Sequence, residues 1–304
     1  MTHKHWHLII PIISPFTGED KLDIDAYNKL VSTLLSKGIS ELLVGSLYGE
    51  SHLMNNKEYE NILRHSIDYA KRLDLIAFSP RTTNLENILL DLRIGIDLGY
   101  KIAFIPISLE FTKSDIHVYR YYDFISSKVD IDVVIFIHDP RLTINHNVLA
   151  ELANENPQII GVVVSSHDIN YLINLMWRLK HEVRSNFLLL SGLDEVFPLS
   201  LILGFNGGLV LSAQVIPNHY IKLLKYFKEQ ELDKFIKTIN EILLFTRLYE
   251  EAYSRISIIK IALSIMYKWF KPILKQPQPS EHSYLYSEVK HILCSLGYIN
   301  GTGN

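Results

Sequence analysis

The sequence predicts an α/β fold, a (β/α)8 barrel of the TIM type followed by a C-terminal extension of three helices. Eight short apolar runs rich in Ile, Val and Leu alternate with longer stretches of helical periodicity. Such nearly continuous apolar runs are typical of parallel strands covered on both faces. The first run leads into Ser14-Pro15-Phe16, without the glycine-rich turn of most dinucleotide-binding open sheets. Eight units in roughly 220 residues therefore favour a closed barrel.

The predicted strands are short, as barrel strands usually are. Each is bounded by glycine, proline or polar residues, which end regular structure. In chain order they are Leu8–Ile13, Glu41–Gly45, Leu75–Phe78, Ile102–Pro106, Val133–Ile137, Ile159–Val164, Phe187–Leu190 and Gly208–Leu211.

The stretches between the strands predict amphipathic helices. In Asp23–Lys37, Lys57–Leu73 and Leu85–Leu98, apolar residues recur at helical spacing and form one stripe. Gly38 and Gly99 stand just after two of these stretches, where glycine commonly ends a helix.

After the eighth strand the alternation stops. Leu232–Leu248, Ala252–Phe270 and Tyr284–Leu296 show helical periodicity with no strand between them. Three prolines between positions 271 and 280 interrupt the chain before the last helix. We therefore expect residues 1–228 to form the barrel and residues 229–304 to form a helical extension packed on it.

Composition excludes several classes of function. The formal net charge is −3, with 30 Lys and Arg against 33 Asp and Glu, whereas proteins that bind nucleic acid carry a basic face. The single cysteine, Cys294, permits neither an internal disulfide nor a thiolate metal cluster. The first residues lack the apolar segment of a secretory leader, and no apolar run approaches the roughly 20 residues of a membrane helix. We expect a cytoplasmic protein that binds neither nucleic acid nor membrane.

Ligand-binding residues of such barrels lie at the C-terminal ends of the strands. There we predict a site for a small oxo-acid or sugar-like ligand. The local alternative is that Asp139-Pro140 makes a turn and that Ser165 or Ser166, with Asp168, satisfies the start of the next helix. The candidate binding residues are Ser46, Tyr48, Gly49, Glu50, His138, Asp139, Arg141 and Ser165.

The sequence gives weaker support to two other kinds of site, a pair of glycosidase carboxyl groups and a histidine metal site. Glu110 and Asp194 follow strands four and seven, where barrel glycosidases carry paired carboxyl groups, but we favour a helix cap for Asp194 and a solvated loop for Glu110. His3, His5 and His7 alternate before the first strand, at the end of the barrel opposite to its reactive face. We expect no metal and no cofactor.

Several segments match one family in order and spacing. The segments are Pro11-Ile12-Ile13-Ser14-Pro15-Phe16, Leu43–Glu50 with its closing Gly49-Glu50, Ile160–Asp168, Leu189–Glu195 and Ile259-Lys260-Ile261-Ala262-Leu263. Together they resemble the dihydrodipicolinate synthase / N-acetylneuraminate lyase family of pyruvate-handling aldolases and lyases.

The resemblance implies a Schiff base between pyruvate and a lysine on strand six, because the iminium is the electron sink for carbon–carbon chemistry. The aligned position is Val163, and no lysine occurs between positions 128 and 180. The family's proton-relaying tyrosine falls on Ile137, and its paired threonines fall on Leu47 and Tyr48. Valine is no nucleophile and isoleucine transfers no proton. We therefore expect no Schiff-base aldolase activity.

Two hypotheses follow. In the first, this divergent barrel is a small-ligand-binding or partner subunit; the resemblance also implies a homo-oligomer (dimer or tetramer) or pairing with an active relative, with interfaces that include tyrosines such as Tyr119, Tyr121 and Tyr122. In the second, it is a lysine-independent lyase or hydrolase that acts on a small oxo-acid or sugar-like substrate at the C-terminal face. A cleft filled by side chains would favour the first; the candidates are Leu47, Phe78, Ile137 and Val163.

Overall fold

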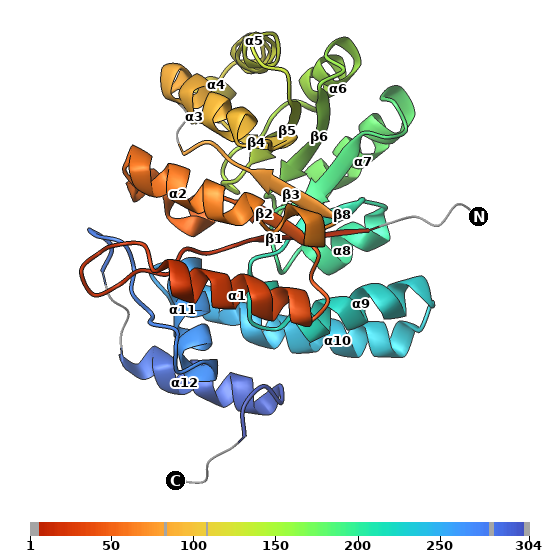
Figure 1. Ribbon diagram of the computed structural model, residues 1–304. Coiled ribbons are helices and arrows are strands. Elements are labelled where there is room, and N and C mark those ends of the chain that lie inside the picture. Colours follow the sequence, from red (N-terminus) through yellow and green to blue (C-terminus); the bar gives the residue numbers. More distant parts are fainter. Residues whose placement is uncertain (1–5, 82–83, 108, 280–282, 301–304) are drawn as a thin grey trace.

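The protein forms a closed barrel of eight parallel strands in a computed structural model that describes residues 6–81, 84–107, 109–279 and 283–300 (Figure 1). Each strand pairs with the next along the chain, and β8 closes the barrel on β1. This confirms the predicted (β/α)8 class. The strands are β1 (His7–Pro11), β2 (Glu41–Val44), β3 (Leu75–Phe78), β4 (Ile102–Pro106), β5 (Asp132–Ile137), β6 (Ile159–Val164), β7 (Leu188–Ser191) and β8 (Gly207–Leu209).

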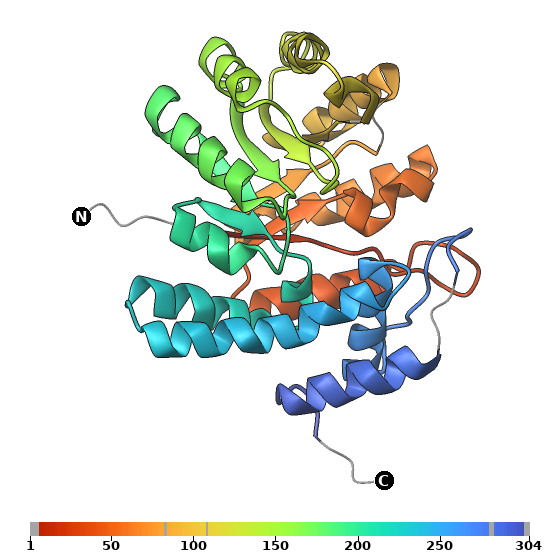
Figure 2. The same ribbon diagram turned by 180° about the vertical axis from the view of Figure 1, so that it is seen from behind.

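Helices surround the barrel, and the three last ones gather on one side of it. Figure 2 shows α10 lying along α9, with α12 farthest from the strands. The helices are α1 (Ile24–Ser36), α2 (Asn56–Ile67), α3 (Leu85–Asp97), α4 (Leu109–Thr112), α5 (Asp115–Ser126), α6 (His146–Glu155), α7 (Ile169–Glu182), α8 (Phe197–Leu203), α9 (Pro217–Lys228), α10 (Leu232–Thr246), α11 (Arg255–Met266) and α12 (Ser283–Ser295). Short 3-10 turns are η1 (Leu47–Gly49), η2 (Ser51–Leu53), η3 (Ala70–Arg72), η4 (Ser212–Gln214) and η5 (Arg247–Glu250).

Local sequence sets the helix ends. The side chains of Asp23, Asn55, Asn84 and Asp168 each accept a hydrogen bond from a backbone N–H in the first turn of the following helix. The prediction that Asp168 starts a helix is therefore confirmed. Gly38 follows α1 with φ of 86°, a left-handed conformation that favours glycine.

Two apolar layers make the core. The larger layer lies between the sheet and the helices and includes residues of α10, α11 and α12, so the C-terminal helices share one core with the barrel. The smaller layer fills the barrel interior, as side chains do in barrels of this size. Its buried members are Ile9, Leu43, Ala77, Phe104, Val134, Phe136, Val163, Leu190 and Leu209.

Ile137 and Phe78 were expected among the side chains that fill the cleft, and the structure corrects this. Ile137 packs in the outer layer, as does Phe78 of β3, so neither of them fills the barrel interior. The interior residue paired in register with Val163 is Phe136. Because successive side chains point to opposite faces, an offset of one residue reverses the assignment. The interior position beside Val163 thus carries a phenyl ring, which transfers no proton either.

Two tyrosines expected at an interface are instead part of this chain's own core. Tyr121 and Tyr122 of α5 are buried. Their hydroxyls donate to the carbonyl oxygens of Pro106 (2.9 Å) and Ile105 (3.0 Å) and fasten α5 to β4. Tyr119 donates to a carboxylate oxygen of Glu155. The expectation was wrong for Tyr121 and Tyr122 because a buried tyrosine can satisfy its hydroxyl within its own fold.

Within the described part of the chain, no helix combines the length and the apolar character needed to cross a bilayer. Among the same residues, no three potential metal ligands of the His, Cys, Asp or Glu type come together. His7 Nδ1 lies 2.8 Å from Glu41 Oε1, and His3 and His5 lie outside the described residues.

Gly161 tests the packing between β6 and β7. A Cβ atom at this position would lie 2.7 Å from both the Cβ and the carbonyl oxygen of Leu188. Because overpacking a dense interior forces neighbouring atoms apart, we expect Gly161→Ala to lower the free energy of unfolding by about 1–3 kcal/mol in urea. The matched control is Gly18→Ala, where no atom lies within 4 Å. Equal unfolding midpoints for the two variants would contradict this packing.

Candidate functional site

The loop after β2 is shaped by a close approach to the end of β1. A Cβ atom on Gly49 would lie 3.1 Å from Ser14 Oγ and 3.2 Å from the carbonyl oxygen of Ile12, so little more than glycine fits here. Glu50 then adopts a left-handed conformation with φ of 58° between η1 and η2. Tyr48 consequently lies over the barrel interior, where its ring centroid is 6.4 Å from that of Phe136.

Residues from several strand ends meet below Tyr48. The ring of His138, after β5, is centred 5.7 Å from that of Phe136. A Cβ atom on Gly192, after β7, would lie 2.3 Å from Ser165 Oγ and 3.0 Å from Val163 Cγ1. We call the group formed by Tyr48, Phe136, His138, Val163 and Ser165 the barrel mouth. The structure thus brings together three of the predicted binding residues, namely Tyr48, His138 and Ser165.

Several buried polar atoms at the strand ends have no hydrogen-bond partner within the described chain. They are the hydroxyl oxygens of Ser14, Ser46, Ser51 and Ser165 and the Nδ1 atom of His138. Buried polar groups in folded proteins nearly always have a partner, in the protein or in a bound molecule. These atoms therefore retain the capacity to bind a polar ligand or water. The local alternative is confirmed for Ser166, whose Oγ accepts from the Asp168 N–H, but not for Ser165, whose hydroxyl has no such bond.

The imidazole of His138 is uncharged near neutral pH. Burial lowers its pKa below the usual value, and this outweighs the opposing effects of Asp139 and of a hydrogen bond with the Phe136 backbone. Tyr48 keeps its proton as well. Burial and the carboxyl groups of Asp194, Glu195 and Asp139 raise its pKa to about 12, against the charge of Arg255.

The charged side chains at the rim of the mouth are paired within the chain. Arg141 Nε lies 2.9 Å from Asp139 Oδ1; the arginine is largely exposed and the aspartate is partly buried. Arg255 of α11 binds Glu195 through both Nη atoms, at 2.7 and 3.1 Å. His167 Nε2 lies 3.0 Å from the same carboxylate. Asp139 and Arg141 are thus at the rim, as predicted, but each neutralises the other.

Asp194 was expected to cap a helix, and the structure gives it another role. Its buried carboxylate accepts hydrogen bonds from the backbone N–H groups of Leu211 (2.7 Å) and Ser212 (2.6 Å) and from the Tyr249 hydroxyl (2.9 Å). It therefore links the ends of β7 and β8 to η5, and it does not cap the next helix, α8, contrary to the expectation from the sequence. Burial raises its pKa above the usual value. Glu110 is exposed, as expected, but it lies in the first turn of α4 and not in a loop.

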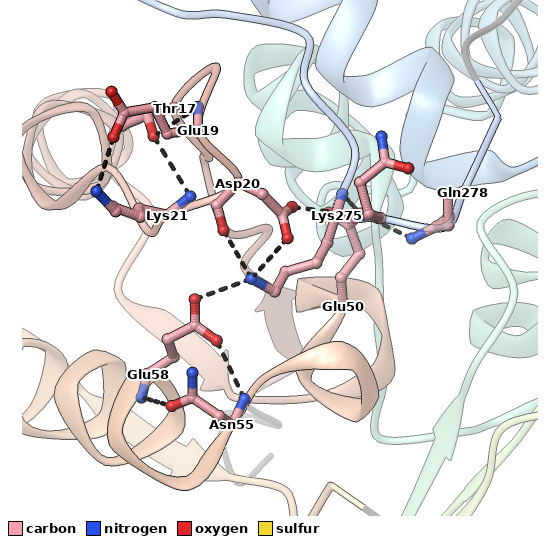
Figure 3. A network of polar contacts seen from close by, with 10 residues as sticks. Thr17, Glu19, Asp20, Lys21, Glu50, Asn55, Glu58, Lys275 and Gln278 are labelled. Atoms are coloured by element: carbon pink, nitrogen blue, oxygen red, sulfur yellow. Dashed lines mark hydrogen bonds and ion pairs between the residues drawn. The ribbon is translucent and has the colours of Figure 1, made fainter.

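Glu50 lies outside the mouth, contrary to its prediction as a ligand-binding residue. Its buried carboxylate pairs with the Nζ of Lys260 on α11. It also accepts from the backbone N–H of Lys275 and from Nε2 of Gln278, both at 2.8 Å (Figure 3). Lys275 Nζ in turn reaches Glu58 Oε1 at 2.8 Å. The carboxylate is fully buried and accepts three hydrogen bonds from the C-terminal extension, so it serves that extension and not the mouth.

Lys260 and Lys275 are the important residues that the sequence analysis did not single out as partners. A lysine inside the apolar stretch Ile258–Leu263 was the available signal, because a buried cation requires a carboxylate nearby. Burial lowers the pKa of Lys260, and burial raises that of Glu50, while their mutual attraction opposes both shifts.

Lys260→Met tests this buried ion pair. Removal of the cation leaves the Glu50 carboxylate buried without its main partner, so we expect a loss of about 3–5 kcal/mol in the free energy of unfolding. The double variant with Glu50→Gln should recover part of that loss, because no charge is then stranded. Exposed Lys268→Met is the control, with an expected change within about 0.5 kcal/mol. A Lys260→Met loss as small as the control's would contradict the assignment.

Comparisons with known proteins identify the family of this chain. The sequence pattern described as the Dihydrodipicolinate synthetase family matches residues 4–295. An uncharacterized DapA-like lyase from Pyrococcus horikoshii is 26% identical over 94% of this chain and 99% of its own length. A 4-hydroxy-tetrahydrodipicolinate synthase from Karelsulcia muelleri is 24% identical over 77% of this chain and 78% of its own.

Solved structures share the fold. Dihydrodipicolinate synthase from Thermotoga maritima superposes with a TM-score of 0.89 at 20% identity, covering 98% of this chain and 100% of that one. A prophage protein of the same family from Escherichia coli K12, solved in complex with pyruvate, has a TM-score of 0.88 at 20% identity over the same shares of the two chains. With a sequence match along nearly its whole length, this chain belongs to the dihydrodipicolinate synthetase family of DapA-like lyases.

Proposed function

We propose that this protein binds a small ligand at the barrel mouth without forming a Schiff base from β6. The observation that carries the proposal is Val163. It is fully buried in the barrel interior, in register with Phe136, at the position where the family resemblance implies a lysine.

The chemistry of the position supports this proposal. Iminium formation needs an amine, and the side chains of Val163 and Phe136 supply neither a nucleophile nor a proton carrier. Lys260 is no substitute, because its ammonium group is buried against Glu50 and the carbonyl oxygen of Ile273. A binding role is supported by the unpartnered Ser165 hydroxyl and His138 Nδ1 at the same mouth.

Assembly and location are part of the same proposal. We infer a cytoplasmic homo-oligomer, or a subunit that pairs with an active relative. The exposed apolar stripe of Ile169, Ile173 and Trp177 along α7 supports an interface, because an apolar row of this kind gains stability when it is covered. This subunit role requires no intact catalytic lysine.

A lysine-independent lyase or hydrolase is the second candidate. The observation in its favour is the His167–Glu195 contact of 3.0 Å at the reactive end of the barrel, since a carboxylate that orients a histidine is a common arrangement for a general base. Against it, Arg255 already binds both oxygens of Glu195.

Treatment with pyruvate and borohydride tests the absence of a Schiff base. Borohydride reduces an iminium to a stable secondary amine, so an active family enzyme gains mass on the intact protein. We expect no stable mass increase for this protein when it is treated in parallel with a lysine-bearing relative. A single pyruvate-derived adduct at a defined residue would overturn the proposal.

Val163→Lys is the matched gain-of-function variant. A lysine here would emerge beside Ser165 and Gly192, in an apolar interior that favours the neutral, nucleophilic amine. We expect this variant to trap pyruvate as one borohydride-stable adduct that peptide mapping places at position 163. Trapping at the same rate by the wild type would show that another lysine does the chemistry.

A further inference from the structure

We propose that the barrel mouth prefers a small, uncharged, polyhydroxylated ligand, such as a short sugar alcohol, over a carboxylic acid. This inference rests on the proposed function, because it names the class of ligand that the same mouth would bind. It departs from oxo-acid binding, which the family resemblance implies.

The first argument concerns the polar groups of the mouth. The buried atoms without partners are hydroxyl oxygens, including Ser165 Oγ, and one imidazole nitrogen, His138 Nδ1. Tyr48 adds a phenol over the same space. Hydroxyl groups both donate and accept, and the free Nδ1 of a neutral imidazole does one or the other according to the tautomer. The hydroxyl groups of a polyol can serve either role, whereas a carboxylate serves only the donors of the set.

The second argument concerns charge. The groups whose charges act on Tyr48 are one guanidinium, that of Arg255, and three carboxyl groups, those of Asp194, Glu195 and Asp139. Arg141 pairs with Asp139 and Arg255 pairs with Glu195, so no free cation of the described chain remains at the rim to bind a carboxylate. The guanidinium is already bound by Glu195 through two hydrogen bonds.

A carboxylate at the mouth would therefore lose its hydration without gaining a free cation. Arg141 offers no alternative, because Asp139 binds it at the exposed rim. Burying a charge without a partner is far less favourable than burying hydroxyl groups that form hydrogen bonds. A ligand ammonium is disfavoured too, since each of the three carboxyl groups already accepts hydrogen bonds from this chain.

The third argument concerns the floor of the mouth. Val163, Phe136 and Leu190 are buried apolar members of the barrel interior. They place hydrocarbon beneath the mouth, and at Val163 the family resemblance implies a lysine instead. The C–H faces of a polyol can cover such a floor while its hydroxyl groups reach Ser165 and His138, a mixture of apolar lining and few polar groups that is usual for ligand sites.

The test uses two probes that differ mainly in charge, xylitol and xylonate, with the full-length protein. Affinities are measured by saturation-transfer NMR titration at neutral pH. We expect xylitol to bind and xylonate to bind at least about tenfold more weakly. Ser165→Ala should weaken xylitol binding about tenfold, because it removes one buried hydrogen-bonding group. The control Ser32→Ala changes an exposed serine of α1 and should leave the affinity unchanged.

A second variant tests the charge argument directly. Glu195→Gln removes the carboxylate that neutralises Arg255, so we expect xylonate to gain about tenfold in affinity relative to xylitol. Circular dichroism and the unfolding midpoint establish that each variant is folded.

The outcomes separate this inference from the proposed function. Xylonate binding that equals or exceeds xylitol binding in the wild type would overturn the inference and leave Schiff-base-independent ligand binding intact. If neither probe binds, the buried hydroxyls hold water only, and the inference fails. The absence of a Schiff base is judged separately by borohydride trapping, which depends on neither probe.

Discussion

The buried ion pair between Glu50 and Lys260 is the constraint on which the loop after β2 and the C-terminal extension depend. A carboxylate without exposure to solvent needs compensation, and here Lys260, Lys275 and Gln278 supply it from α11 and the segment that follows. The pair thereby ties the loop after β2 to the C-terminal extension. Because Glu50 is directed toward that extension, Tyr48, two positions earlier, is left over the barrel interior. The extension is therefore a structural part of the mouth.

The mouth itself combines an apolar floor with charges that neutralise one another. Val163 and Phe136 provide the floor, and Glu195 and Asp139 bind the two rim arginines. Membership of a family of lyases and the absence of an amine on β6 are compatible, because the barrel needs only the shape and hydrophobicity of its interior to fold. In the proposed function, no reaction depends on an amine from β6, and the polar groups that remain at the mouth decide which ligand binds.

Much of the fold could be predicted because strand and helix periodicity are local properties. The strands observed begin and end within a few residues of those expected, and Asp168 caps a helix as its position suggested. The errors concern where a side chain points. Ile137 and Phe136 differ by one residue along β5, yet they belong to different layers. Asp194 precedes a helix, yet its carboxylate binds backbone groups after β8.

The sequence by itself determined the barrel, the C-terminal helices, the family resemblance and the absence of a lysine on the sixth strand, since each follows from residues read in order. Only the tertiary structure decided that Glu50 serves the C-terminal extension, that Arg255 lies at the rim beside Tyr48, and that Ser165 and His138 retain unpartnered buried atoms. These features depend on contacts between segments far apart in the chain. The partner of a buried polar group is set by the packing of the whole fold, and no local pattern records it.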